Sequence, residues 1–467
     1  NMALCCDFLA WRLSLFAEMK YHCTLAERHA ELLRQHGGET LLSYLGQLHH
    51  RPLPDILPSE DLLTEVRDYF TPFFGAENAG ECADVLRRRR CLSTANHHHP
   101  AFEYMTVQDT ILCDRWLRTQ GESGAVVPFL ACANPRLDNN VYPRGMLVYD
   151  CAAPEGCLRL PFYPFKLRHA CVAAVEGISP DMVGNALDRL RQEMRRGSCS
   201  LRTADALERF CREVLLSDRV QHCGTLQEQT TVINAMLSQR YFTDRAPQYL
   251  WMPMETLTAR LLERDLRTED ALTCQMLFRQ ELRASLLREL DGVSGCWTGD
   301  AGGTHFFWGL DRRAALFPLR LRESAGTAAL TGQNSLGEAV TVPLTPQVLT
   351  EGLRDGSLLP GLFLCFLEAH FLRDFTVFGG FYQPTYLAEM RRGLVRALRE
   401  TGGYETEAAI IEAKRNAMTL GLIYLLRSRE GGCFPVSTAE LLEQPVSTPE
   451  VEANLQGSVA AALEHLN

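Results

Sequence analysis

The spacing of apolar residues along the chain predicts helical ends and a mixed α/β centre. Short apolar runs at 126–132 (VVPFLAC), 146–149 and 248–252 have the length and composition of buried strands, and an apolar repeat with helical spacing at 102–116 precedes the first of them. A helix followed by a buried strand is typical of an α/β layer with parallel pairing. We therefore predict an α/β, helix-rich fold with helical parts at both ends.

Changes in this pattern predict three consecutive segments. Residues 1–90, with two shorter helices after Pro58, are expected to form an N-terminal helical segment. Residues 91–380 are expected to form an α/β core with a helical insertion at about 179–290, and residues 381–467 a C-terminal helical segment. The 467 residues exceed the roughly 250–300 at which one hydrophobic core stops growing, so two or three packed lobes are expected.

Some elements are marked by the residues at their ends. Ser179 predicts an N-cap, Pro180 suits a first helical turn and Gly197 closes the same helix. The runs 305–310 and 314–321 predict the two strands of a hairpin.

Composition limits the partners and the compartment. A formal net charge of −10 without a long basic stripe argues against nucleic acid as the main partner. Charged residues interrupt the apolar stretch around 8–16, so it is expected to be neither a signal peptide nor a membrane span. The 17 cysteines are scattered singly along a long chain, which favours reduced thiols. We expect a soluble, cytoplasmic protein with a small-molecule substrate and with no nucleic-acid or membrane partner.

Three consecutive histidines form the most conspicuous polar motif, Asn96-His97-His98-His99-Pro100. Proline disfavours the helical region for the preceding residue, so His99 is expected to be extended and to share a face with His97. No HExxH or CxxC spacing supplies the further ligands that a metal site needs, and we predict no metal. The three histidines are candidate acid–base or anion-binding groups, with Asn96 as a binding residue. The alternative is a polar loop that caps the next helix.

A second polar loop follows the 126–132 strand, at 134–145 (NPRLDNNVYPRG). Ligands of open α/β sheets collect at the carboxyl ends of strands, where this loop begins. The alternative is a surface loop whose turns satisfy their own backbone. The candidate binding residues are Arg136, Asp138, Asn139 and Arg144.

A third group of polar residues lies in and after an apolar stretch, 361–374, that predicts a buried helix. His370 and Asp374 are four residues apart and therefore placed to pair. Polar groups here either line a pocket or form a buried ion pair without a catalytic role. The candidate binding residues that follow are Gly379, Gly380, Gln383 and Tyr386.

Parts of the chain resemble the bacillithiol-synthesis cysteine-adding enzymes. Thr94-Ala95-Asn96-His97-His98, then a helix and VVPFLACANPRLDNN, is similar in layout to that family's N-terminal motifs. PQYLWMPMETL, the hairpin near 305–321, and Leu358-Leu359-Pro360 followed by Gly379-Gly380 and Tyr386 are similar to its later order of features. The resemblance covers about half of the chain. It implies a Rossmann-like sheet layer with a pocket where the two stretches meet.

The same resemblance implies a ligase or transferase that joins small polar molecules. Ala133-Asn134-Pro135 stands where that family has an acidic-His-acidic motif, so only the location of the site is carried over. We expect an enzyme that binds a polar or anionic substrate in an α/β cleft, with Arg136 and Arg144 as clamps. The alternatives are a metal-dependent hydrolase using His97 and His99, and a non-catalytic ligand-binding or scaffold protein. The sequence defines neither a cofactor nor an oligomeric state.

Overall fold

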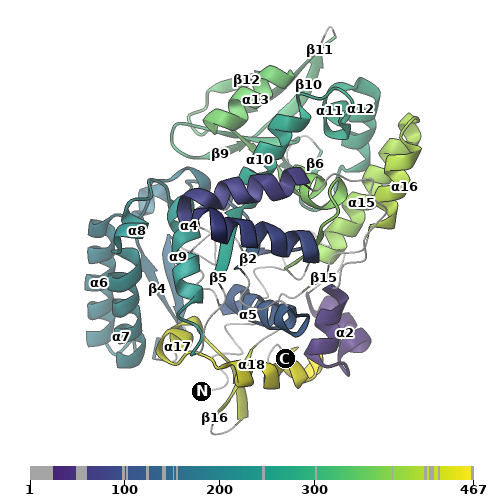
Figure 1. Ribbon diagram of the computed structural model, residues 1–467. Coiled ribbons are helices and arrows are strands. Elements are labelled where there is room, and N and C mark those ends of the chain that lie inside the picture. The colour runs from purple at the N-terminus through teal and green to yellow at the C-terminus, as the bar shows by residue number, and fades with distance from the viewer. Residues whose placement is uncertain are drawn as a thin grey trace.

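The chain folds as a mixed α/β protein in which helices surround a central sheet, and a smaller β-rich part lies beside them (Figure 1). In the part of the chain that the structure describes, no helix has the length and apolar character needed to cross a bilayer. The computed structural model describes residues 25–48, 60–96, 100, 104–121, 126–138, 144–150, 152–153, 156–243, 248–299, 302–324, 326–380, 382–414, 418–419, 425–429 and 432–463.

The central sheet has five strands, and every neighbouring pair is parallel. Its order is β15-β14-β1-β2-β5. The chain therefore builds outward from β1 through β2 to β5, and then returns to the other side of β1 to add β14 and β15. The direction of building reverses between β1 and β14. The strand bounds are β1 (Cys91–Asn96), β2 (Val126–Ala131), β5 (Gln248–Pro253), β14 (Thr376–Gly379) and β15 (Met418–Thr419).

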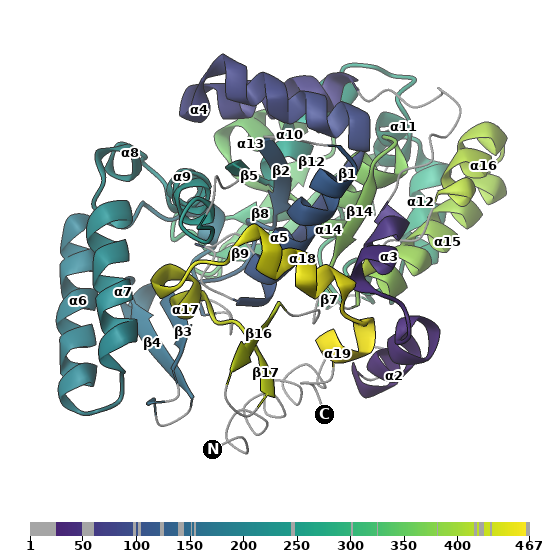
Figure 2. The ribbon, with the colours of Figure 1, turned by 60° about the horizontal axis from the view of Figure 1, so that its bottom comes forward.

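The two faces of this sheet contribute to two different hydrophobic cores. Leu92, Leu250 and Val377 belong to one core, whereas the neighbouring Tyr249 and Phe378 belong to the other, as strand alternation requires. Helices cover both faces of the sheet, and Figure 2 shows α4 and α5 on opposite sides of it. The first face is covered by α4 (Glu60–Arg89), α10 (Met254–Asp265) and α15 (Gln383–Thr401), and the second by α5 (Tyr104–Thr119) and α9 (Leu226–Ser238).

Two predictions for the helical regions are confirmed. The segment Glu60–Arg89 is broken at Gly75, whose φ of 82° lies outside the helical region, so two helical parts follow Pro58 as expected. Helix α6 (Pro180–Arg195) begins at Ser179, whose hydroxyl accepts a hydrogen bond from the Met182 N–H. The remaining helices of this half are α2 (Leu25–His36), α3 (Leu41–Leu45), α7 (Leu201–Phe210) and α8 (Asp218–Gln221), with a π-helical turn at Cys211–Leu215.

The strand predicted at 146–149 exists, but it is not part of the parallel sheet. It is β3 (Gly145–Tyr149), which forms a separate antiparallel hairpin with β4 (Cys157–Pro161). The apolar character of this run reflects packing against the helical layer of α6 and α7, since Met146 and Val148 belong to the same core as these helices.

The described residues of the β-rich part form two antiparallel sheets of three strands and the antiparallel pair β6–β7. The hairpin predicted at 305–321 is confirmed as β8 and β9, and β13 joins it. The strand β11 was not predicted, because its sequence, TAALTGQ, is mostly half-exposed and lacks an apolar run. The bounds are β8 (Phe307–Leu310), β9 (Leu316–Pro318), β10 (Arg320–Ser324), β11 (Thr327–Gln333), β12 (Ala339–Pro343), β13 (Leu358–Pro360) and α13 (Pro346–Asp355), with β6 (Trp297–Thr298) and β7 (Gly302–Gly303) beside them.

The expectation of an all-helical C-terminal segment is wrong in part. Strand β15 adds to the parallel sheet, and β16 pairs with β17 in a hairpin. Two-residue and four-residue strands carry no recognisable periodicity, and only their tertiary pairing defines them. The C-terminal elements are α16 (Glu405–Ala413), β16 (Leu426–Arg429), β17 (Gly432–Pro435), α17 (Thr438–Glu443), α18 (Thr448–Gln456) and α19 (Val459–Leu463). Three further helices precede this segment: α11 (Leu272–Phe278), α12 (Gln280–Glu289) and α14 (Leu362–Phe366).

A buried arginine ties three elements of the first face together. Arg373 lies between α14 and β14 and pairs with Asp61 of α4 (2.5 Å), Asp265 of α10 (3.3 Å) and Glu368. Its side chain is 2% exposed. Three carboxylates around one buried guanidinium are mutually dependent, because each is desolvated and relies on the same positive charge.

Replacing Arg373 by Met is expected to lower the free energy of unfolding by about 3–5 kcal/mol, because Glu368 is left as an uncompensated buried carboxylate. Urea denaturation measures the loss. The matched control is Arg67→Met on the exposed side of α4, where the side chain is 51% exposed and the expected change is below about 0.5 kcal/mol. Equal effects of the two substitutions would contradict the structural role given to Arg373.

Candidate functional site at the carboxyl edge of the sheet

Two segments that are far apart in the sequence meet where β1 and β14 end. Leu92 pairs with Val377 and Ser93 with Phe378 in the parallel ladder. One step further, the Thr94 hydroxyl lies 2.8 Å from Gln383 Oε1 and 3.2 Å from the Phe378 carbonyl oxygen. The segments beginning at residue 94 and at residue 379 are therefore side by side at the carboxyl edge of the sheet.

Gly379 allows this close approach. A Cβ atom at this position would lie 2.1 Å from Gln383 Oε1 and 2.9 Å from Thr94 Oγ1, so a larger residue would push β14 and α15 apart. After Gly380 the chain enters α15, and the Gln383 N–H donates to the Gly380 carbonyl (3.0 Å). The paired glycines thus form a short turn that brings the N-terminus of α15 against the end of β1.

Two buried amide side chains at this edge have unsatisfied polar atoms. Gln383 is 2% exposed and Asn96 is 3% exposed. The Thr94 hydroxyl orients the Gln383 amide by donating to its oxygen, which leaves Nε2 without a hydrogen-bond partner among the described residues. In the same part of the chain, Asn96 has no partner for either Nδ2 or Oδ1. Leaving such a group unsatisfied costs about 1–3 kcal/mol, so native proteins seldom do so without a reason.

A β-bulge changes the direction of the Asn96 side chain. Ser93 pairs with Phe129 and Asn96 pairs with Ala131, so one extra residue lies in β1 between the two pairs. Bulges of this kind often redirect a side chain next to a functional site. The Asn96 carbonyl remains fixed, because it accepts a hydrogen bond from the Cys132 N–H (2.9 Å).

The buried carboxylate of Glu255 organises the neighbouring loop, and the sequence analysis missed it. Glu255 lies in the first turn of α10, immediately after β5, and accepts hydrogen bonds from the Ala133 N–H (2.6 Å) and the Asn134 N–H (3.2 Å). Burial raises the pKa of Glu255 to about 7, and the N–H donors lower the pKa only in part. An acidic residue directly after a buried strand was the available signal, since it stands at the same sheet edge.

The predicted clamp residues have contacts within the 136–169 part of the chain. Arg136 donates to Asp138 (3.0 and 3.1 Å), and Asp138 also lies 2.9 Å from His169. Arg144 donates to the Tyr163 carbonyl (2.9 Å) and its guanidinium lies 5.4 Å from the centre of the Phe165 ring. The contacts that orient both guanidinium groups are thus made with Asp138 and the 163–169 segment.

The other predicted site residues fall into three groups. Tyr386 lies in the first turns of α15, half-buried, with its ring 5.8 Å from that of Phe366. Gly379, Gly380, Gln383 and Asn96 are at the carboxyl edge, as described above. The candidate residues His97, His98, His99 and Asn139 lie outside the described residues.

The expected pairing of His370 with Asp374 is wrong. His370 Nδ1 lies 2.7 Å from the Phe375 carbonyl oxygen, and burial lowers the pKa of His370 to about 4. Asp374 instead pairs with Arg90 and Lys414, each at 3.1 Å. Arg90 directly precedes β1 and Asp374 lies two residues before β14, so this ion cluster lies at the amino edge of the sheet and joins the same two strands there.

Comparison with family models, with curated proteins and with solved structures gives no significant match.

The raised pKa of Glu255 predicts a pH-dependent difference between the protein and its Glu255→Gln variant. The folded pKa of about 7 lies above the unfolded value of about 4.5, so the unfolded state releases the proton first as the pH rises. The contribution of Glu255 to stability is therefore complete below pH 4.5 and is lost as the pH approaches 7. Glutamine does not titrate, and its amide can accept only one of the two backbone hydrogen bonds, a cost that is the same at every pH.

Urea denaturation at pH 5 and pH 8 measures this difference. The unfolding free energy of Glu255→Gln relative to the natural protein is expected to rise by about 2.5 kcal/mol between the two pH values. The same relative stability at both pH values would show that Glu255 titrates normally.

Proposed function

We propose that the protein is an enzyme of small-molecule metabolism, of ligase or transferase type, that binds a polar or anionic substrate between the ends of β1 and β14. The observation that supports this most strongly is the pair of buried amides, Asn96 and Gln383, with donors and an acceptor that lack partners in the described part of the chain. A polar ligand would satisfy these atoms, and the cost of burying them would then be recovered on binding.

We also propose that the sheet is Rossmann-like. Numbered in chain order, its strands follow the sequence 3-2-1-4-5, and the reversal falls between β1 and β14. Ligands of doubly wound sheets bind outside the carboxyl ends of the strands at such a reversal. The N-terminus of α15 faces this edge after the Gly379-Gly380 turn, which favours a negatively charged group on the ligand.

The reaction class rests on the resemblance to the bacillithiol-synthesis cysteine-adding enzymes. Both stretches that carry it contribute to this edge, through Thr94 and Asn96 on one side and Gly379 and Gly380 on the other. His97, His98 and His99 continue the chain from Asn96, and in this proposal they act as acid–base or anion-binding groups. Arg136 and Arg144 act more remotely, because Arg136 pairs with Asp138 and Arg144 contacts Tyr163 and Phe165.

A thermal-shift screen with nucleotides, sugar phosphates and amino acids tests the proposal. A ligand present at 100 times its Kd is expected to stabilise the protein by about 2.7 kcal/mol. Gln383→Met removes the unpaired Nε2 at nearly constant volume, and we expect it to abolish this stabilisation. The stability of the free variant should change by less than about 1 kcal/mol, because the loss of the Thr94 hydrogen bond is offset by the removal of an unsatisfied donor.

The matched control is Gln192→Met on the exposed side of α6. This substitution should leave the stabilisation by every ligand in the thermal-shift screen unchanged. A ligand whose stabilisation survives both Gln383→Met and Asn96→Ala binds elsewhere, and the proposed site is then misplaced. Metal analysis of the purified protein separates the hydrolase alternative, for which a stoichiometric metal lost in His97→Ala would be required.

A further inference from the structure

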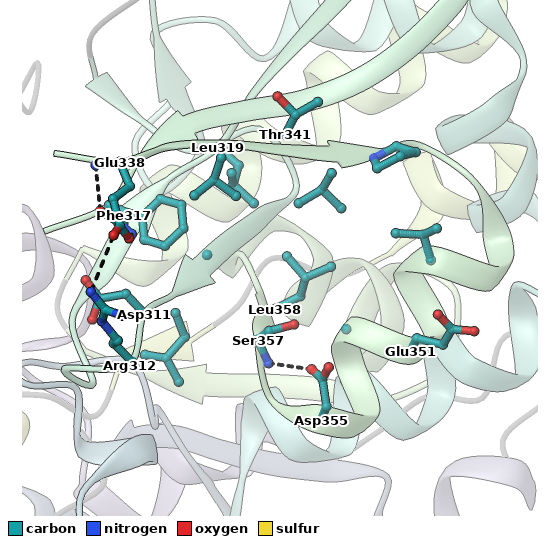
Figure 3. Close-up of a pocket in the computed structure, with 18 residues that line it drawn as sticks. Asp311, Arg312, Phe317, Leu319, Glu338, Thr341, Glu351, Asp355, Ser357 and Leu358 are labelled. Carbon is teal, nitrogen blue, oxygen red and sulfur yellow. Dashed lines mark hydrogen bonds and ion pairs between the residues drawn. The ribbon is translucent and has the colours of Figure 1, made fainter. Parts of the chain in front are cut away.

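A cavity of about 470 Å³ opens in the β-rich part, between β12, α13 and the sheet of β8, β9 and β13 (Figure 3). Its volume is in the range of small-molecule sites. The walls are apolar: Phe317 and Leu358 are buried, and Val340, Val342 and Val348 are half-buried. The cavity therefore offers a binding surface for the apolar body of a ligand.

Two glycines keep the walls of this cavity close together. A Cβ atom at Gly309 would lie 2.3 Å from the Phe317 ring, which packs over β8. A Cβ atom at Gly352 would lie 2.7 Å from Leu358 Cδ1, so this glycine lets α13 approach β13. The close packing of these two walls thus requires glycine at both positions.

The polar lining of the cavity is strongly acidic. Arg312 on one side is only 3.4 Å from Glu338, which offsets its charge. Figure 3 shows Glu351 and Asp355 on α13, away from this pair. The charged lining residues are Asp311, Glu338, Glu351 and Asp355, against Arg312.

The position of Glu351 and Asp355 is unfavourable for the helix itself. Asp355 is the last residue of α13 and Glu351 is one turn earlier, so two like charges share a face at the negative end of the helix dipole. Glu351 accepts a hydrogen bond from Gln347 Nε2 (2.9 Å) and Asp355 accepts one from the Ser357 N–H (2.8 Å), and both donors are neutral. Arg354, the basic residue of this turn, donates instead to Glu263 of α10 (2.6 Å). A positive charge placed beside Glu351 and Asp355 would offset both effects.

We propose that this cavity binds an organic cation, an ammonium or guanidinium group carried on an apolar body. The cation lies beside Glu351 and Asp355, and the body lies against Val340, Val342 and Leu358. An organic cation fits better than a metal ion, because no group of three or more His, Cys, Asp or Glu side chains in the described ranges is arranged to hold a metal. This site is separate from the carboxyl edge of the parallel sheet and does not depend on the function proposed there.

Calorimetric titration of the full chain tests the proposal with three probes that share one apolar body. 4-Phenylbutylamine is expected to bind at least five-fold more tightly than 4-phenylbutanol, and 4-phenylbutanoate more weakly than either. Raising the salt concentration should reduce the advantage of the amine, because the carboxylates are exposed to solvent. Equal affinity of amine and alcohol, or no binding of the amine, would overturn the proposal.

The double variant Glu351→Gln with Asp355→Asn identifies the groups responsible. Its affinity for the amine should fall to that of the alcohol, whereas the control Asp188→Asn, on the exposed side of α6, should bind like the natural protein. The free double variant should also unfold at a Tm no lower than that of the natural protein, because two unfavourable charges are removed from α13. Unchanged amine binding in the double variant would contradict the assignment.

A comparison of two peptides distinguishes a protein side chain from a free amine as the source of the cation. Acetyl-Leu-Lys-Leu-amide is compared with the same peptide carrying norleucine in place of lysine. Tighter binding of the lysine peptide than of 4-phenylbutylamine indicates a protein side chain as the natural ligand, and weaker binding indicates a free amine. Binding of the lysine and norleucine peptides with the same affinity would count against a cation site.

Discussion

The parallel pairing of β1 with β14 is the constraint on which the rest of the structure depends. Residues separated by more than 280 positions must form this ladder before the sheet can extend in both directions. The pair is held at both ends: the ion cluster of Arg90, Asp374 and Lys414 joins the amino ends, and Thr94 with Gln383 joins the carboxyl ends. Because the chain reverses its direction of building between these strands, α5 after β1 and α15 after β14 pack on opposite faces of the sheet.

The two edges of this pair differ in how completely their polar groups are satisfied. At the amino edge, Asp374 has two cationic partners and His370 is bonded to a backbone carbonyl. At the carboxyl edge, Asn96 and Gln383 are equally buried, but their donors have no partner among the described residues. Buried polar groups contribute to stability only when they are paired, so the first edge is explained by folding and the second calls for a ligand.

The sequence predicts much of the local structure, and the tertiary structure explains what it misses. Ser179 and the 126–132 and 248–252 runs are local signals, because a cap and a buried strand are visible within a few residues. Strands β15 and β16 are too short to show a period, and β3 is apolar because of helices elsewhere in the chain. Of the candidate site, the approach of residue 94 to residue 379 was expected. The bulge before Asn96 and the role of Glu255 were not, since both depend on partners far along the chain.

NMR spectra of the protein labelled with ¹⁵N at asparagine and glutamine give the most direct test, through the signals of the side-chain amides. The signals of Asn96 and Gln383, identified by their loss in Asn96→Ala and Gln383→Met, should shift when a stabilising ligand is added, and their hydrogen exchange should slow. A ligand that stabilises the protein fully while both signals stay unchanged would contradict the central claim that these two amides form its binding site.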